Sequence, residues 1–359
     1  MAKPNCYAVI LAGGRGTRFW PRSRRTKSKQ VLNVFGERTL IQETVERLRS
    51  VVPPERCWIL TNRHLRPEIV RQLPEVPREQ ILAEPEQRNT APAIGLAAHI
   101  LRSIEPGALM GVFPSDHVIL KPSRYRKFVR AAFREAARGN IGILGIAPRW
   151  AETGFGYIEL PEGVETGSTE PAPVLRFREK PDAETASAYV EAGRFFWNAG
   201  MFFWRAEVLL EALRKFQPKT FTLLSSLPAF SHRGFARKLA EVFPLCESIS
   251  IDYAVLERAD NVTCLTCDDI GWNDVGSWQA VYDLLARDEH GNSRQSEVLA
   301  SDSRGNYVDA KGKLVALLGV NDLVVVDTPD ALLIADRSRS QEVGDLVKLL
   351  EKRKREDLL

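Results

Sequence analysis

The sequence predicts an α/β protein with a doubly wound, mostly parallel sheet, followed by a small β module. Between Cys6 and Ile146, short apolar runs alternate with helical patterns, which is typical of strand–helix units. The runs are continuously apolar, as expected for parallel strands that are buried on both faces. Beyond Gly291, apolar runs recur at closer spacing between turn residues, and this texture indicates an all-β module.

The elements follow from these patterns in chain order. We expect strands at Cys6–Ala12, Cys57–Thr61, Gln80–Ala83, Leu109–Pro114, Ile141–Ile146, Tyr157–Leu160, Val174–Glu179 and Gly200–Trp204. We expect helices at Leu40–Val51, His64–Leu73, Thr90–Ile104, Tyr125–Arg138, Glu184–Ala192, Ala206–Lys215, Phe235–Phe243 and Ile251–Arg258. The module should contain strands Tyr307–Val308, Leu314–Leu318, Leu323–Val326 and Ala331–Ala335, then a helix Gln341–Arg355. The segment Lys352–Asp357 should be a frayed, solvated end.

Length and composition suggest two domains of a globular protein. The chain has 359 residues, of which 44% are hydrophobic and 27% are charged. We divide it into residues 1–290 and 291–359. There is no signal-peptide pattern, and no apolar run approaches the ~20 residues of a membrane span, so we expect a cytoplasmic protein without a membrane partner. Five scattered cysteines favour reduced, buried thiols.

The charge is nearly balanced overall but not locally. The net charge of +4 is too small to indicate a nucleic-acid partner. Seven Lys or Arg and no acidic residue lie between Arg15 and Lys29. Such a cluster suits a compact polyanion such as a triphosphate, although a charge run is more often a solvated face.

A glycine-rich turn follows the first strand. It reads Ala12-Gly13-Gly14-Arg15-Gly16-Thr17-Arg18, and glycines at a strand end let backbone N–H groups approach an anion closely. The turn is neither a Walker A loop nor a dinucleotide fingerprint. Arg18 is able to clamp phosphate oxygens, and Lys29 is able to act as a point charge.

Residues 9–32 (VILAGGRGTRFWPRSRRTKSKQVL) resemble the signature of sugar-1-phosphate nucleotidyltransferases. Trp20-Pro21 and Lys29-Gln30 are similar to the mannose-1-phosphate guanylyltransferase branch. The resemblance implies the Rossmann-like nucleotidyltransferase fold and catalytic roles for Arg18 and Lys29. It also implies nucleotide contacts from Leu11, Ala12, Gly13, Gly14, Gly16 and Thr17. The sequence departs from the pattern at Ser28, where proline is usual, so we expect a looser approach to Lys29.

Two aspartates are candidates for a metal site. Asp116 lies in Pro114-Ser115-Asp116-His117 after a predicted buried strand, and Asp274 lies in the segment IGWNDVGSW. Taken alone, each is more often a turn or cap residue. The two segments resemble the metal-carboxylate motifs of the family, which implies that Asp116 and Asp274 hold Mg²⁺ and that Ser115 contacts the nucleotide. His117 should be structural or lie in the outer shell of the site.

Further motifs concern the base and the sugar. The segment AEPEQRNTA (83–91) is able to cap a helix at Thr90 but resembles the purine pocket of mannose-type guanylyltransferases, which implies base contacts from Glu84, Arg88, Asn89 and Thr90. The segments TGFGY, FREKP, WNAG and SIDY resemble the sugar-phosphate motifs of the family. They imply contacts from Gly156, Tyr157, Glu179, Lys180, Asn198 and Asp252, with Lys180 aligning the attacking phosphate.

The reaction implied by the resemblance is GTP plus mannose-1-phosphate giving GDP-mannose and pyrophosphate. The alternatives are a guanylyltransferase for another sugar such as a heptose, a silent regulatory paralogue that binds nucleotide-sugar, and an RNA-binding protein. An RNA-binding protein would need stacking aromatics, which apart from Phe19 and Trp20 are missing near the basic cluster. The β module resembles a short left-handed β-helix that serves dimerisation, so we expect a homodimer without a fused isomerase domain.

Overall fold

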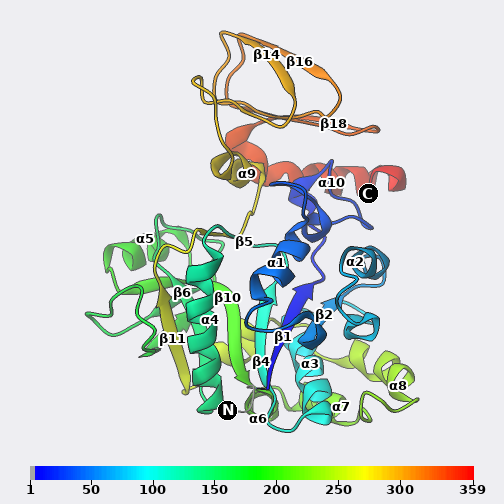
Figure 1. The fold of residues 1–359 in the computed structure, drawn as a ribbon, viewed down its shortest axis with the longest axis vertical. Helices are drawn as coiled ribbons and strands as arrows, with labels where there is room; N and C mark the ends of the chain where they lie inside the picture. Colours follow the sequence, from blue (N-terminus) through cyan, green and yellow to red (C-terminus); the bar gives the residue numbers. More distant parts are fainter. Residues whose placement is uncertain (1–4) are drawn as a thin grey trace.

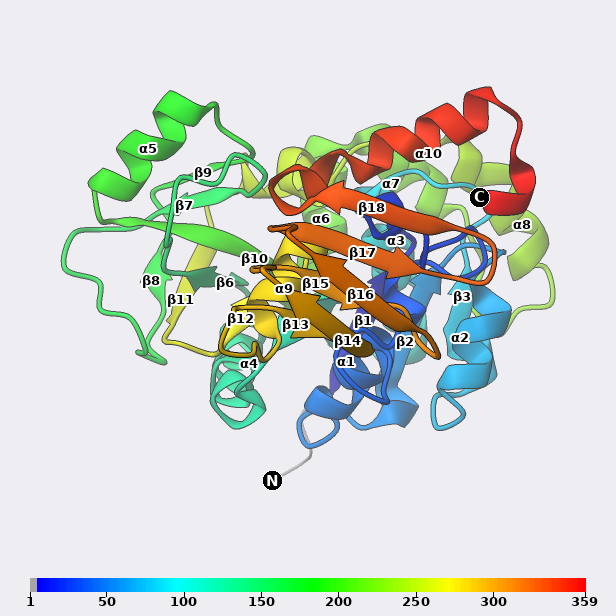
Figure 2. The same ribbon diagram turned by 90° about the horizontal axis from the view of Figure 1, so that it is seen from above.

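A central mixed sheet and a C-terminal β module make up the computed structural model, which describes residues 5–359 (Figures 1 and 2). The main sheet has the order β3-β2-β1-β4-β10-β6-β11-β8, with β7 paired to β10 and β9 paired to β7. Its strands are β1 (Cys6–Ala12), β2 (Cys57–Thr61), β3 (Ile81–Ala83), β4 (Leu109–Pro114), β6 (Ile141–Ile146), β7 (Tyr157–Glu159), β8 (Ala172–Pro173), β9 (Arg176–Arg178), β10 (Phe195–Arg205) and β11 (Val262–Cys267). A separate pair joins β5 (Val118–Ile119) to β12 (Trp272–Asn273).

The pairing is mostly parallel. Strands β3, β2, β1 and β4 are parallel neighbours, and so are β6 and β11, whereas β10 runs antiparallel between β4 and β6. Parallel strands place their carboxyl ends at one edge, so the loops after Ala12, Thr61, Ala83 and Pro114 begin side by side.

Helices cover both faces of this sheet. They are α1 (Leu40–Leu48), α2 (Arg66–Gln72), α3 (Thr90–Ile104), α4 (Pro122–Ala137), α5 (Ala183–Glu191), α6 (Ala206–Phe216), α7 (Pro218–Ser225) and α8 (Phe235–Val242). Alternate residues of β1 enter different cores: Val9 packs in one apolar cluster, and Ala8 and Ile10 pack in the other. The prediction of a sheet buried on both faces is therefore confirmed.

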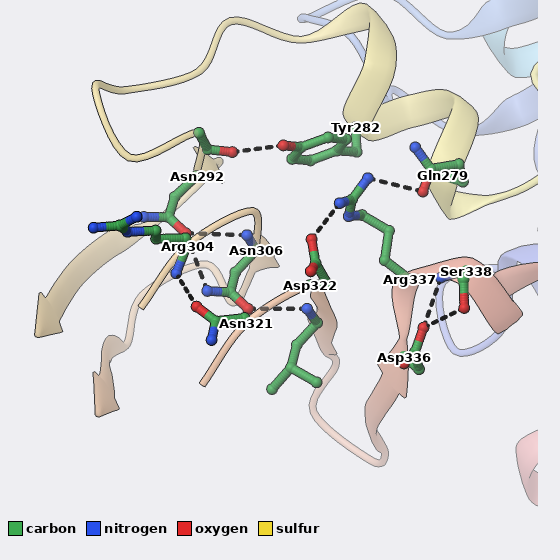
Figure 3. A network of polar contacts seen from close by, with 12 residues as sticks. Gln279, Tyr282, Asn292, Arg304, Asn306, Asn321, Asp322, Asp336, Arg337 and Ser338 are labelled. Carbon is green, nitrogen blue, oxygen red and sulfur yellow. Dashed lines mark hydrogen bonds and ion pairs between the residues drawn. The ribbon is translucent and has the colours of Figure 1, made fainter. Parts of the chain in front are cut away.

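The C-terminal module is a parallel β-helix-like structure. Its strands are β13 (Ser293–Arg294), β14 (Glu297–Ser301), β15 (Tyr307–Asp309), β16 (Leu314–Leu318), β17 (Leu323–Asp327) and β18 (Leu332–Asp336). Strands β13, β15 and β17 pair in parallel, β14 pairs in parallel with β16, and β18 closes the first sheet in antiparallel fashion. Asn292, Asn306 and Asn321 stack at the turns; Asn306 Nδ2 donates to Asn292 Oδ1 at 3.0 Å (Figure 3). These bonds satisfy buried turn amides and hold successive coils in register.

The module packs against the rest of the protein through one apolar cluster. Helices α9 (Trp278–Leu284) and α10 (Val343–Lys352) lie between it and the main sheet (Figure 1). The cluster joins Phe19 and Trp20 of the glycine-rich segment to Trp278, Tyr307 and Val343. None of the helices within residues 5–359 is long and apolar enough to cross a membrane.

The segment Lys352–Asp357 is exposed, as expected, but it is not frayed, because a short 3₁₀ helix follows α10 at Glu356–Leu358. Leu358 is only 8% exposed, and its carbonyl accepts a hydrogen bond from Trp20 Nε1 at 3.1 Å. A residue near the end of the chain is thereby attached to the segment that follows β1. The five cysteines are buried and free, as predicted, and burial raises the pKa of Cys57 to about 12.

Candidate active site

The glycine-rich turn lies at the carboxyl end of β1, between the loops that follow β2 and β4. Gly16 has φ of 60°, and a Cβ at this position would lie 2.7 Å from Cβ of Lys29, so only glycine fits here. Gln30 Nε2 donates to the carbonyl of Ala12 at 2.9 Å and to that of Gly14 at 3.2 Å. Sequence reasoning missed this role of Gln30, which fixes the turn from beneath and leaves its N–H groups free to face an anion.

Lys29 connects the two sides of the crevice. Its Nζ lies 2.9 Å from Oδ2 of Asp116 and donates to the backbone carbonyl of Asp274 at 2.6 Å. The structure thus brings together three residues that lie far apart in the sequence. Ser28 is fully buried with φ of −79° and ψ of 172°, which is close to the φ that proline would impose. The backbone therefore has here the extended form that proline would favour.

The two carboxylates share one electrostatic environment. Burial raises the pKa of Asp274, and the negative charge of Asp116 raises it further, against Lys29 and Arg18. Burial opposes ionisation of Asp116 as well and is the largest single influence. The charge of Lys29, followed by His117 and hydrogen bonds to the carboxylate, together outweigh it, so the pKa of Asp116 falls below its usual value. Two neighbouring, partly buried carboxylates fit a divalent cation that completes its shell with phosphate oxygens and water.

Other side chains around the carboxylates do not add a metal ligand. His117 Nδ1 accepts a hydrogen bond from Trp272 Nε1 at 3.2 Å, and burial lowers the pKa of His117 to about 4. The imidazole is therefore neutral and structural, as expected. No three His, Cys, Asp or Glu side chains of residues 5–359 gather as an all-protein metal site. A cation between Asp116 and Asp274 would depend on oxygens from the substrate.

The predicted nucleotide residues surround a cavity of about 470 Å³ beyond β1, β3 and β4. Of the predicted set, the cavity is lined by Leu11, Gly13, Gly14, Glu84, Asn89, Thr90, Ser115 and Asp116. Burial raises the pKa of Glu84 to about 8. Asn89 Oδ1 accepts from the Thr90 amide at 2.8 Å and caps α3, so this segment both caps the helix and faces the cavity.

Four predicted nucleotide residues lie outside this cavity. Ala12 directs its carbonyl to Gln30 and is buried, and Arg88 pairs with Glu86 at 3.0 Å. Gly16 packs on Lys29, and Thr17 lies beside α10. Gly16 therefore shapes the turn from outside the cavity.

A second crevice of about 390 Å³ opens next to the carboxylates. It is lined by Arg18, Lys180 and Asp274 together with Gln341 of the C-terminal module. Lys180 has φ of 47°, an uncommon backbone conformation for a residue with a side chain, and its Nζ lies 3.1 Å from Glu179 Oε1. Arg149, Glu152 and Asp283 line it as well, so the crevice gathers three cations and three carboxylates from distant segments, and its cations are able to offset phosphate charge.

The predicted sugar residues meet on β7, β10 and the π-helix Asp252–Leu256. Asn198 Nδ2 donates to Asp252 Oδ1 at 3.0 Å, and the Asn198 amide donates to the Gly156 carbonyl at 2.8 Å. A Cβ on Gly156 would lie 2.5 Å from Glu179 Oε2, so Glu179 occupies the space that glycine leaves. Burial, with Glu179 next, raises the pKa of Asp252 to about 7. Four of the predicted sugar-binding residues therefore form one polar cluster, namely Gly156, Glu179, Asn198 and Asp252.

Tyr157 is placed differently from its expected role. Its side chain is fully buried, and its hydroxyl is bonded to the backbone of Glu152, with both contacts at 2.9 Å. The tyrosine side chain is therefore part of the core and supports the loop that precedes β7.

The basic cluster has a different main role from the one that the sequence suggests. Four of its arginines pair with carboxylates of the C-terminal module, and the pairs are Arg15–Glu351, Arg22–Asp309, Arg24–Asp330 and Arg25–Glu356. Most of the cluster thus attaches the module, and Arg18 and Lys29 are the cations that face the crevice and the carboxylates.

Comparison with known proteins agrees with this geometry. The nucleotidyl transferase family model matches residues 7–291, and the mannose-phosphate isomerase/GMP-like β-helix domain model matches residues 296–350. Mannose-1-phosphate guanylyltransferase of Escherichia coli (strain K12) is 39% identical over 359 residues, which cover 98% of this chain and 74% of that protein. Mannose-1-phosphate guanylyltransferase 2 of Escherichia coli O157:H7 is 38% identical, covering 100% and 76%.

A solved structure from Thermus thermophilus, described as a mannose-1-phosphate geranyltransferase, superposes with a TM-score of 0.84 at 33% identity. It covers 97% of this chain and 99% of that one, so the likeness includes both the sheet and the module. The chain spans about three quarters of the length of these curated relatives. Nucleotidyltransferases of this family generally use a divalent metal ion. The chain is an enzyme of the nucleotidyltransferase family and belongs with the mannose-1-phosphate guanylyltransferases.

Proposed function

We propose that the enzyme transfers GMP from GTP to mannose-1-phosphate, giving GDP-mannose and pyrophosphate. The observation that carries this proposal is the contact of Lys29 with both Asp116 and Asp274. These three residues lie between the predicted nucleotide cavity and the cluster of predicted sugar-binding residues. The relatives named mannose-1-phosphate guanylyltransferase support the choice of both substrates.

Each part of the site then has a chemical task. Guanine presents N–H donors that suit the carboxyl oxygens of Glu84, and the triphosphate follows the glycine-rich turn toward Arg18 and Lys29. The attacking phosphate of the sugar is already ionised near neutral pH, so no general base is needed. Lys180 aligns this phosphate for in-line attack, while Arg18 and Lys29 offset the charge of the leaving pyrophosphate.

The divalent cation is proposed to be Mg²⁺, held by Asp116 and Asp274. Mg²⁺ prefers one or two carboxylates together with phosphate oxygens and water, and these two carboxylates supply that number. When bound, the cation would offset the negative charge of the phosphate groups.

The decisive experiment measures pyrophosphate release across a matrix of nucleoside triphosphates and sugar-1-phosphates with Mg²⁺. We expect the highest kcat/KM for GTP with mannose-1-phosphate. A preference for a heptose phosphate would show that mannose is not the preferred sugar. Complete inactivity with nucleotide-sugar binding retained would favour a regulatory paralogue.

We propose further that the enzyme is a cytoplasmic homodimer assembled through its β module. Three large apolar side chains are exposed on β14 and β16, namely Leu299, Leu314 and Leu318, and the last is 77% exposed. Adjacent exposed leucines on a short sheet suit burial against a second copy. The free, buried cysteines fit a reducing compartment. Sedimentation of wild type against Leu318→Lys tests the assembly; an unchanged mass would contradict it.

A further inference from the structure

The C-terminal module neutralises the arginines around the glycine-rich turn with one exception. Four of them each form an ion pair with a carboxylate of that module, namely Arg15, Arg22, Arg24 and Arg25. Their positive charge is therefore offset within the protein, and it contributes little to attraction of a phosphate in the crevice.

Arg18 receives a different partner from the same module. Its Nη1 donates to Oε1 of Gln341 at 2.5 Å, and no carboxylate of residues 5–359 forms an ion pair with it. A neutral amide orients a guanidinium without cancelling its charge. The remaining N–H donors of Arg18 stay available to oxygens of a ligand.

The position of Gln341 puts this contact inside the substrate crevice. Gln341 lies in the short 3₁₀ helix Arg337–Glu342, directly before α10, and lines the crevice together with Arg18, Lys180 and Asp274. The segment is anchored on both sides. Ser340 Oγ accepts from the amide of Gln279 on α9 at 3.2 Å, and α10 packs closely against the turn at Thr17.

We infer that the β module completes the phosphate site, and that Gln341 is a positioning residue that holds Arg18 toward the crevice as a cation without a direct ion-pair partner. This inference rests on the proposed function, because Arg18 is taken to bind phosphate oxygens of GTP and pyrophosphate. The residue type decides the outcome: a carboxylate at position 341 would form a bidentate pair with Arg18 and compete with phosphate.

The test compares Gln341→Glu, Gln341→Ala and the control Arg339→Gln in the full-length enzyme. Arg339→Gln changes the net charge by the same amount as Gln341→Glu, and Arg339 is an exposed residue paired with Glu342, away from the crevice. The measurements are KM for GTP, KM for mannose-1-phosphate, kcat, and calorimetric binding of magnesium pyrophosphate. Thermal unfolding reports whether each variant is folded.

We expect Gln341→Glu to raise KM for GTP and weaken pyrophosphate binding by about tenfold or more, as for a lost charge-assisted hydrogen bond. KM for mannose-1-phosphate should stay within about twofold, because Lys180 rather than Arg18 aligns the sugar phosphate. Gln341→Ala should lower kcat more than it raises KM for GTP, since Arg18 keeps its charge but loses its orientation. Arg339→Gln should match wild type.

Two outcomes separate this inference from the proposed function. If wild type transfers no nucleotide but Gln341→Glu still weakens pyrophosphate binding, the function is wrong and the positioning role stands. If wild type is active and Gln341→Glu behaves like Arg339→Gln in both assays, the positioning role is overturned. Should Gln341→Glu not fold, unchanged kcat and KM for GTP in Gln341→Ala overturn it equally.

Discussion

Lys29 contacts the Asp116 carboxylate and the Asp274 carbonyl at the same time, so one ammonium both orders the site and carries positive charge into it. Lys29→Ala should lower kcat by about 10²-fold or more, as for removal of one preorganised electrostatic group. The fold should persist because the apolar cores do not include this residue. Steady-state pyrophosphate release and thermal unfolding together check this expectation.

A matched control lies two residues away. Lys27 is exposed and belongs to the same basic cluster, so Lys27→Ala removes the same charge without touching the carboxylates. Its kcat should stay within about twofold of wild type, as is usual for exposed substitutions. Near-normal turnover in Lys29→Ala, or equal loss in both variants, would contradict the assigned role.

Glu84 gives the empty enzyme a pH-dependent stability. Burial raises its pKa from 4.5 to about 8, so the folded state holds this proton more tightly than the unfolded chain does. The corresponding stability is complete below about pH 4.5 and is lost as pH rises toward 8. Glu84→Gln removes this loss. The unfolding temperature of the variant relative to wild type should therefore increase between pH 5 and pH 8, measured without nucleotide.

The comparison with wild type across pH is its own control. A constant difference between Glu84→Gln and wild type over that range would show that Glu84 titrates normally in the folded protein. With GTP, the variant should show a raised KM above about pH 8, where Glu84 of wild type is ionised, because an amide cannot accept both guanine N–H donors as an ionised carboxylate does.

At the scale of single residues, the sequence predicted those that lie in a recognisable motif. It missed those that act through contacts with distant parts of the chain. Lys29, Asp116 and Asp274 meet as the resemblance implies. Gln30 and Gln341 are amides without a distinctive local pattern, and the bond from Arg18 to Gln341 spans 323 positions of the chain. Only the folded topology shows such contacts.

At the scale of elements, the positions of β7 and β9 depend on Gly156, which has no side chain. A Cβ at Gly156 would lie 2.5 Å from Glu179 Oε2 and 3.3 Å from Asn198 Cβ. Gly156→Ala should therefore displace Glu179 and raise KM for mannose-1-phosphate by about tenfold or more, because small misplacements of positioning groups are costly. KM for GTP should change by less than about twofold. Initial rates with each substrate varied in turn give both constants.

Gly36→Ala is the matched control for this prediction. A Cβ at Gly36 meets no atom within 4 Å, so this variant adds the same methyl group in open space. It should leave both Michaelis constants unchanged. A normal KM for mannose-1-phosphate in Gly156→Ala would show that Glu179 does not contact the sugar of that substrate.

Elements with continuous apolar runs were predicted with correct limits, and amphipathic or aromatic segments less well. The limits of β1, β2, β4, β6 and α3 match the prediction. The helix expected at Ile251–Arg258 is instead a π-helix at Asp252–Leu256, and β10 begins earlier than expected, at Phe195. Helix α7, which starts at Pro218 directly after α6, and helix α9 were not predicted. Both have eight residues or fewer, which is too short for a clear 3.6-residue periodicity.

At the scale of the molecule, the two predicted domains pack as one body around the glycine-rich segment. Phe19 and Trp20 share an apolar cluster with Trp278, Tyr307 and Val343. Trp278 Nε1 donates to the Trp20 carbonyl at 3.2 Å, which adds a buried polar link. The environment of the glycine-rich turn is therefore built by residues from both ends of the chain, and stability of the module should be coupled to stability of the sheet.

The ion pair between Arg22 and Asp309 tests that coupling. The two side chains are 14% and 2% exposed, and Arg22 also donates to Asn33 Oδ1 at 3.1 Å. Asp309→Ala leaves a largely buried guanidinium without its charge partner, which should lower the free energy of unfolding by roughly 3 kcal/mol. Glu356→Gln breaks the exposed pair with Arg25 and should cost less than about 1 kcal/mol.

Urea unfolding followed by tryptophan fluorescence and by circular dichroism should give one shared transition in both variants. Separate transitions, with the far-ultraviolet signal of the sheet unchanged in Asp309→Ala, would show that the module folds independently of the site that it borders.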